Sequence, residues 1–308
     1  MNLRRYAWIS LLVAFVVIFL KIAAYILTDS VSLLSDALES VVNILGASAT
    51  MWALAVSEQP PDDEHAHGHD KAEYFSSGFE GALVLVAAIV IISTAIVRFV
   101  HPQEIDASPY GIALALGTSG INFILARWLL RAAKQHDSMA LEADARHLMS
   151  DVVTSIAVSG GIVLAVLTSI QWIDPLFALL VGLNIIRTGW DLVKRSADGL
   201  LDASLLPADH QRVLSVIHHF KSENIDFHAI RTRRSGARKF VTFHVLVPGD
   251  WSVQRGHEVL EAIEIELTHA IPHLHVTTHL EPNDDPSSFH DIELHRPITQ
   301  PNRISPTG

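Results

Sequence analysis

Long apolar segments dominate the first two-thirds of the chain. Six of them have about the 20 residues that a helix needs to cross the hydrocarbon core of a bilayer. They cover residues 7–27, 31–56, 79–100, 110–132, 146–170 and 175–193. A soluble helical core does not require repeated apolar runs of this length. The pattern therefore predicts an all-α bundle of six membrane-spanning helices in a domain at residues 1–200.

Beyond residue 201 the apolar positions follow a different pattern. Two segments have the spacing of amphipathic helices, and three have the character of short strands. In chain order they are a helix at 207–223, strands at 227–233 and 239–247, a helix at 253–270 and a strand at 274–280. This α-β-β-α-β order predicts a small cytoplasmic α+β domain at residues 201–282, with helices on one face of the sheet. Residues 283–308 lack periodicity and predict a disordered tail.

Two of the predicted spans each carry a pair of metal-capable side chains four residues apart. The second span has Glu39 and Asn43, and the fifth has His147 and Asp151. This spacing puts both members of a pair on one helix face. A charged carboxyl deep in hydrocarbon costs roughly 2.5–3.5 kcal/mol, so such residues usually have a function. The two pairs predict a four-ligand site for a divalent cation; the alternative is a set of polar groups that stabilise helix packing.

The loop at residues 57–76 is the second candidate site. Three acids, Asp62 to Glu64, precede the alternating histidines His65, His67 and His69. As a set they predict a surface metal site, whereas each residue taken alone fits a solvated loop equally well. Asp36, seven residues before Asn43, shares its helix face and either lines the outer mouth of the pathway or lies near the lipid headgroups.

Charge and composition narrow the function further. The net charge of −11, from 22 basic and 33 acidic residues, suggests cation affinity and argues against a nucleic-acid partner. The chain has no cysteine, which excludes thiolate metal sites and fits a bacterial inner membrane. Arg4 and Arg5 precede the first span and Lys194 and Arg195 follow the sixth, so both termini are predicted to be cytoplasmic. No H-E-x-x-H sequence is present, which argues against a metalloenzyme.

At these residues the chain resembles the cation diffusion facilitator family of divalent metal transporters. The resemblance covers roughly residues 5–282, and its strongest segments are "SVSLLSDALESVVN", "HAHGHDKAEYFSSG", "ARHLMSD", "DPLFALLVG" and "FHAIRTRRSG". It implies a transport site with two ligands from the second span and a His-x-x-x-Asp pair from the fifth. These positions are Glu39, Asn43, His147 and Asp151.

The resemblance implies further sites and partners. A second metal site would use Asp62, His65 and His69 of the loop. A dinuclear site in the metallochaperone-like cytoplasmic domain would use His228, His244, His257, His279 and Glu281, for each of which a solvated face is otherwise the better interpretation. An ion pair would join Lys71 to Asp202. Family members are homodimers that exchange divalent metal for protons across the lipid bilayer.

Two positions depart from the family pattern. The usual pair in the second span is Asp-x-x-x-Asp or His-x-x-x-Asp, whereas this chain has Glu39-x-x-x-Asn43. Asn43 supplies a neutral oxygen, so the site has two formal negative charges, and its oxygen-rich set suits manganese or ferrous iron as well as zinc. Leu280 stands between His279 and Glu281, where some members have a polar residue.

The sequence therefore predicts a proton-coupled antiporter that exports divalent transition metals from the cytoplasm. Zinc is the first expected substrate, and manganese, iron, cobalt and cadmium remain open. The alternative is a membrane metal sensor or binding protein that transports nothing, in which the intramembrane ligands hold a structural ion.

Overall fold

The computed structural model describes residues 3–28, 31–101, 109–168, 170, 172–290 and 292. The chain divides into two compact units, Met1–Leu201 and Asp202–Gly308. Within the segment predicted as a disordered tail, residues 291 and 293–308 lie outside the described residues.

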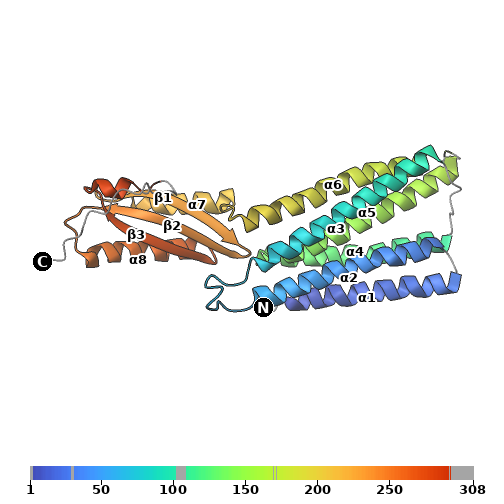
Figure 1. Ribbon diagram of the computed structural model, residues 1–308, viewed down its shortest axis with the longest axis horizontal. Helices are drawn as coiled ribbons and strands as arrows, with labels where there is room; N and C mark the ends of the chain where they lie inside the picture. Colours follow the sequence, from blue (N-terminus) through green and yellow to red (C-terminus); the bar gives the residue numbers. More distant parts are fainter. Residues whose placement is uncertain are drawn as a thin grey trace. The chain divides into compact units, whose positions relative to one another are not determined.

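The first unit is a bundle of long helices, which run side by side in Figure 1. They are α1 (Arg4–Thr28), α2 (Val31–Ser57), α3 (Ala72–Val100), α4 (Pro109–His136), α5 (Met139–Thr168) and α6 (Ile173–Leu200). The closest pairs are α3 with α6, α4 with α5 and α1 with α2. The prediction of six long helices is confirmed.

Glycines allow α3 and α6 to approach closely. A Cβ atom at Gly81 would lie 2.9 Å from the Cβ of Leu192, and one at Gly189 would lie 2.9 Å from the Cγ of Leu85. Helices in lipid have no hydrophobic force that drives them together. Small residues at a crossing let the two backbones approach closely, and the resulting van der Waals contacts stabilise the pair.

The outer surface of the bundle is apolar, as lipid contact requires. Phe19, Ile89 and Ile124 are all more than half exposed. Within the described residues, four helices have a segment long and apolar enough to cross a membrane, and α2 has a shorter apolar stretch. These segments are Arg4–Ala23, Ala72–Val100, Ile112–His136 and Pro175–Leu200, and the shorter one is Asn43–Ser57.

Two helices begin earlier than the apolar pattern predicted. The third apolar run starts at residue 79, yet α3 starts at Ala72, and α5 starts at Met139 where the run starts at 146. The early turns of α3 contain Glu73, Ser76 and Ser77, which are buried inside the protein. Hydropathy marks the length in contact with hydrocarbon, whereas a helix continues as long as its polar side chains find partners.

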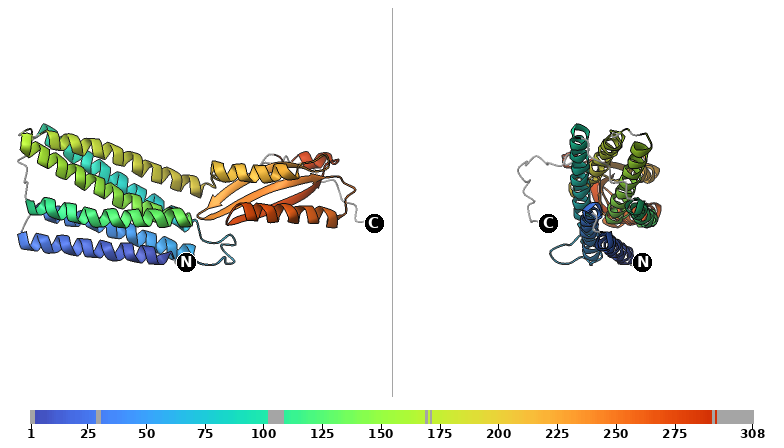
Figure 2. Two further views of the ribbon diagram at one scale, coloured as in Figure 1. Left: turned by 180° about the vertical axis from the view of Figure 1, so that it is seen from behind. Right: turned by 90° about the vertical axis from the view of Figure 1, so that its right-hand side faces the viewer.

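The second unit has the predicted α-β-β-α-β order, which is confirmed. Its elements are α7 (Pro207–Phe220), β1 (Asp226–Ser235), β2 (Arg238–Val247), α8 (Val253–Ala270), β3 (Leu274–Pro282) and a short 3-10 helix, η1 (Pro286–Phe289). The sheet order is β1-β2-β3, with β1 antiparallel and β3 parallel to β2. Figure 2 shows α7 and α8 lying along the strands.

Strand alternation gives the sheet one apolar face and one polar face. Val241, Phe243 and Val245 of β2 are buried in a core with residues from α7 and α8, including Val213 and Ile263. The alternate residues of each strand point to the opposite face, which the core helices do not cover. This second face holds three of the candidate ligands, His228, His244 and His279.

Candidate metal centres

Three of the intramembrane candidates lie together between α2 and α5. The side-chain amide nitrogen of Asn43 donates to Oδ2 of Asp151 at 2.7 Å. The amide oxygen of Asn43 lies 3.0 Å from Nε2 of His147, and that nitrogen lies 4.0 Å from Oδ2 of Asp151. The predicted i, i+4 pair of α5 therefore meets Asn43 across the helix interface.

The amide of Asn43 determines which nitrogen of His147 carries a proton. Its oxygen only accepts hydrogen bonds, so Nε2 of His147 carries the proton in this arrangement. Nδ1 of His147 is buried and has no hydrogen-bond partner within the described part of the chain. Asn43, His147 and Asp151 satisfy one another, and a metal ion would replace these bonds.

The fourth predicted ligand is Glu39, one turn from Asn43 along α2. The backbone of α2 extends through Glu39 and Asp36. The side chains of both residues lie outside the described residues, so their predicted roles stay predictions.

Two buried carboxyl groups that the sequence reasoning missed lie near these ligands. Glu80 of α3 is fully buried and accepts a hydrogen bond from the hydroxyl of Thr50 on α2. Asp144 of α5 is 3% exposed and hydrogen-bonds Ser10 of α1. The signal for Asp144 was available, because it stands three residues before His147 on the same helix face.

A third buried acid, Glu73, helps to position α5. Its carboxylate accepts hydrogen bonds from the hydroxyl of Ser138 at 2.6 Å and from the backbone N–H of Ala140 at 3.2 Å. A carboxylate at this place satisfies free N–H groups of the first turn and complements the helix dipole. Glu73 thus connects α3 to the start of the helix that carries His147 and Asp151.

Two further polar contacts within the bundle were not predicted. Arg195 of α6 makes a two-bond contact with Glu142 of α5, at 2.7 and 2.9 Å, and so ties these helices together. Lys21 of α1 is 8% exposed and donates to the hydroxyl of Ser40 at 2.8 Å, next in sequence to Glu39. Lysine inside a bundle of membrane helices is as costly as a carboxylate and was a readable signal.

The loop candidates also come together. Oδ1 of Asp62 lies 3.0 Å from Nδ1 of His65, and its Oδ2 lies 3.4 Å from Nε2 of His69. One potential ligand atom from each of the three residues lies within 4.8 Å of the others. Slight desolvation opposes the charge of Asp62, but hydrogen bonds from the backbone and imidazole of His65 hold its pKa below the usual value.

In the cytoplasmic unit, Glu281 of β3 is the centre of the cluster. Its Oε2 lies 2.8 Å from Nε2 of His228 and 3.2 Å from Nδ1 of His244. Its Oε1 lies 3.4 Å from Nε2 of His279, whose side chain is 64% exposed. The register explains this geometry, because His244 of β2 stands opposite both His228 and His279. One potential ligand atom from each of His228, His244 and Glu281 lies within 4.8 Å of the others.

His257 and Leu280 do not join this cluster in the single chain. His257 is exposed on α8 and lies 3.9 Å from Glu261. Leu280 faces the helices, since a Cβ atom at Gly256 of α8 would lie 2.2 Å from its Cδ2. Leu280 therefore departs from the family at a position on the core face, away from the ligands. A ligand role for His257 stays a prediction.

The predicted ion pair between Lys71 and Asp202 would join the two units, and it stays a prediction. Within the first unit, Lys71 donates to the backbone carbonyl of Leu200 at 3.3 Å. Within the second, Asp202 lies 3.4 Å from a guanidinium nitrogen of Arg233.

Comparisons with known proteins cover nearly the whole chain. The model of the cation efflux transmembrane domain matches residues 7–201, and that of the cation efflux protein cytoplasmic domain matches residues 205–283. The uncharacterized transporter sll1263 from Synechocystis sp. is 45% identical over 98% of both chains. The cation-efflux pump FieF from Pectobacterium atrosepticum is 30% identical over 88% of this chain and 89% of that protein.

Among solved structures, the metal-bound C-terminal domain of the CzcD transporter from Thermotoga maritima covers 26% of this chain and 92% of its own. Its sequence identity is 27% and its TM-score is 0.24.

The apolar helices and the two matched domains define an integral membrane protein of the cation-transporting class. The chain belongs to the cation efflux, or cation diffusion facilitator, family of divalent metal transporters. It is accordingly a transporter and not an enzyme.

Proposed function

We propose that this protein is a proton-coupled antiporter that exports divalent transition metals from the cytoplasm. The observation that carries the proposal is the contact of Asn43 with both His147 and Asp151 across α2 and α5. The protein acts as a homodimer in a bacterial inner membrane, with both termini in the cytoplasm. Zinc is the first expected substrate, with manganese, iron, cobalt and cadmium as the alternatives.

Metal binding must break the hydrogen bonds between these ligands. Nε2 of His147 has to give up its proton to water before its lone pair can reach a cation, and Nδ1 keeps its own proton in the metal-bound state. The amide oxygen of Asn43 and the carboxylate of Asp151 become available in the same step. Binding of metal is therefore linked to movement of a proton at His147.

Release follows from the same chemistry in reverse. When the helices rock so that the site faces outward, protons compete for His147 and the carboxylates. Once His147 is protonated at Nε2, it again donates to Asn43, and the ligands hold one another rather than the metal. A proton gradient directed inward would thus drive metal outward.

The direct test is metal flux into proteoliposomes under a pH gradient, with zinc, manganese, ferrous iron, cobalt and cadmium compared. The Asp151→Asn variant keeps the size of the side chain but removes its charge, and flux should be abolished. Transport by this variant at the native rate would contradict the assignment of the site. The Asn43→Asp variant, assayed in parallel, tests whether Asn43 determines the choice of metal.

The cytoplasmic cluster favours a second function, metal sensing. Glu281 with His228 and His244 would bind a cation whether or not the bundle transports one. In an antiporter, this site would link cytoplasmic metal to dimerisation. Removal of residues 207–308 should then weaken dimerisation and change metal dependence. If sealed vesicles show no protein-mediated flux while metal still binds, sensing is the whole function.

A further inference from the structure

The buried carboxyl groups of Glu80 and Asp144 have no place among the metal ligands described above. Glu80 meets Thr50, which stands seven residues after Asn43 on the same face of α2. Asp144 stands three residues before His147 on α5. Thr50 and Asp144 thus continue the row of polar side chains from the transport site along α2 and α5, and Glu80 of α3 meets this row at Thr50.

Each carboxyl is only half satisfied. One oxygen of Glu80 accepts from Thr50, and the Asp144 carboxyl is bonded to Ser10. The other oxygen of each, Oε2 of Glu80 and Oδ2 of Asp144, is buried without a hydrogen-bond partner among the described residues. Burying a carboxylate oxygen without a hydrogen-bond partner is unfavourable. A bound cation or a proton on the carboxyl would remove this cost.

The surroundings of the pair contain no compensating cation within the described part of the chain. The two carboxyls are electrostatic neighbours, and the other charged or titratable groups that act on Asp144 are His147 and Asp151. From α1 and α2 the pair receives only the hydroxyls of Ser10 and Thr50. Two buried carboxyls that repel each other do not both ionise readily, and one proton on either of them removes the repulsion.

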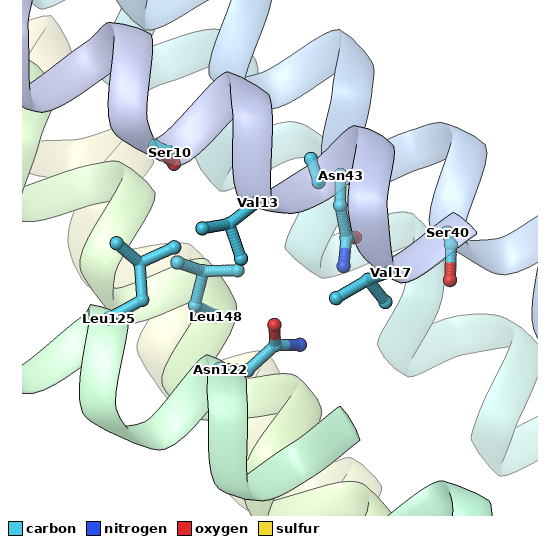
Figure 3. A pocket seen from close by; sticks show the side chains of 9 residues that line it. Ser10, Val13, Val17, Ser40, Asn43, Asn122, Leu125 and Leu148 are labelled. Carbon is cyan, nitrogen blue, oxygen red and sulfur yellow. The ribbon is translucent and has the colours of Figure 1, made fainter. Parts of the chain in front are cut away.

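A small cavity borders both Asn43 of the transport site and Ser10, the hydrogen-bond partner of Asp144. Its volume is about 10 Å³, and Ser10, Asn43 and Asn122 are among its lining residues. Figure 3 shows Asn43 and Asn122 pointing into it from opposite sides. A cavity of this size has room for about one water molecule, and Ser10, Asn43 and Asn122 are among the few polar groups that such a water could bond in a mostly apolar lining. Ser10, which bonds Asp144, therefore faces the same space as the metal ligand Asn43.

We propose that Glu80 and Asp144 together hold one proton while the transport site is free of metal and release it when a divalent cation binds Asn43, His147 and Asp151. The O–H bond of the carboxylic acid breaks, and the proton passes to water by way of Ser10 and the cavity. The pair then carries two negative charges instead of one, and this added negative charge offsets one of the two positive charges of the cation. The inference rests on the proposed transport function and adds a second proton to that of His147.

The test uses full-length protein in proteoliposomes and measures the apparent KM for zinc over a series of pH values. Each proton that metal displaces makes log KM fall by about one further unit for each unit by which the pH rises, and the size of this fall is the slope compared below. The Glu80→Gln and Asp144→Asn variants should each lower the slope by about one unit relative to the native protein. Glu80→Asp keeps a titratable group and should restore it.

Glu73→Gln is the matched control, because it changes another buried acid of α3 in the same way. Glu73 bonds the start of α5 and not the proposed pair, so the slope should keep its native value whatever the absolute rate. A native slope in both Glu80→Gln and Asp144→Asn would overturn the proposal.

A second measurement does not depend on transport. Infrared spectra of the purified, metal-free protein at neutral pH should contain a protonated-carboxyl band that Glu80→Gln or Asp144→Asn removes and zinc diminishes. Absence of this band in the native protein would overturn the proposal. Failure of the native protein to carry metal, with the band present, would instead contradict the transport function alone.

Discussion

The proposed transport site and the cytoplasmic cluster combine similar side chains in opposite ways. In the bundle the central group is the neutral amide of Asn43, which donates to Asp151 and accepts from His147. In the cytoplasmic unit the central group is the carboxylate of Glu281, with three histidines around it. An amide that hydrogen-bonds both neighbouring ligands competes with the metal and favours its release. A carboxylate surrounded by imidazoles has a negative charge that favours retention of the metal.

The secondary structure that carries each site also differs, because one site lies on packed helices and the other on a sheet. His147 and Asp151 share a helix that contacts α3, α4 and α6, so a shift of α5 changes the site as a whole. His228, His244 and Glu281 lie on hydrogen-bonded strands whose register holds them together. Helices that slide past one another suit alternating access, and a sheet suits a fixed binding site.

The largest effect is expected for Asp151→Asn, which should abolish transport without changing zinc binding to the cytoplasmic cluster. Asp151→Asn should lower zinc flux at least about 100-fold, since removal of even a supporting group costs a metal site 10- to 100-fold. Binding of zinc to the cytoplasmic cluster should persist, as equilibrium dialysis of the purified variant would measure. Loss of both properties together would break the distinction.

The next largest effect is expected from the reciprocal substitution, which changes the cytoplasmic cluster and leaves the bundle intact. Glu281→Gln removes the charge that joins three histidines and should weaken zinc binding to the cytoplasmic cluster about 10- to 100-fold. Transport at saturating zinc should continue, because the ligands in the bundle are intact. Abolished flux, with the variant folded and dimeric, would show that the cytoplasmic cluster is part of the pathway.

Asn43→Asp makes the bundle site more like the cytoplasmic one. The added charge should tighten zinc binding about tenfold, slow its release and move preference from manganese and iron toward zinc. Flux competition between zinc and manganese in proteoliposomes measures the change. An unaltered preference would mean that Asn43 is a tolerated ligand without influence on selectivity.

Within the cytoplasmic cluster, exposure predicts a smaller effect for one histidine. His279 is 64% exposed, whereas the side chain of His228 is 11% exposed. His279→Ala should therefore reduce zinc affinity less than His228→Ala does. The loss expected for His279→Ala is about 1 kcal/mol or less, which is the scale of exposed charge pairs. Isothermal titration of the two variants provides the comparison, and equal losses would contradict it.

The smallest expected effect concerns Asp226, at the start of β1. The ammonium of Lys221, 2.7 Å away, lowers the pKa of Asp226 below its usual value. A lowered pKa stabilises the folded state above the unfolded pKa of about 3.9, and this contribution is lost as the pH falls through the folded value. Asp226→Asn should remove that part of the pH dependence from thermal unfolding between about pH 5 and pH 3.

Lys221→Met is the control for Asp226, because it removes the same ion pair from the other side. Both variants should leave zinc binding by the cluster unchanged at neutral pH. A large loss of stability from either one would mean that this strand depends on its surface charges more than its exposure indicates.

Much of the architecture was predictable because its signals are local. Apolar length identified α1 to α6, and the change to short alternating runs identified β1, β2 and β3 in their correct order. The pair His147 and Asp151 followed from helical periodicity, and its approach to Asn43 agrees with the four-ligand hypothesis. Resemblance to the family supplied the cytoplasmic candidates, which periodicity alone left as solvated histidines.

Other features of the sites depended on contacts between distant segments. Glu80 and Glu73 look like polar interruptions at the start of an apolar run, and only packing gives them Thr50 and Ser138 as partners. Likewise, the resemblance to the family grouped His257 with the cytoplasmic ligands, whereas in the single chain it lies near Glu261.

By itself, then, the amino-acid sequence determined the class of protein, the order of its elements and the pairs of candidate ligands on single helices. The tertiary structure decided that Asn43 bonds both His147 and Asp151, and that Glu80 and Asp144 are neighbours. The reason is physical: periodicity depends on residues within one or two turns of each other. The state of a buried polar group depends on helices that the chain brings together from far apart.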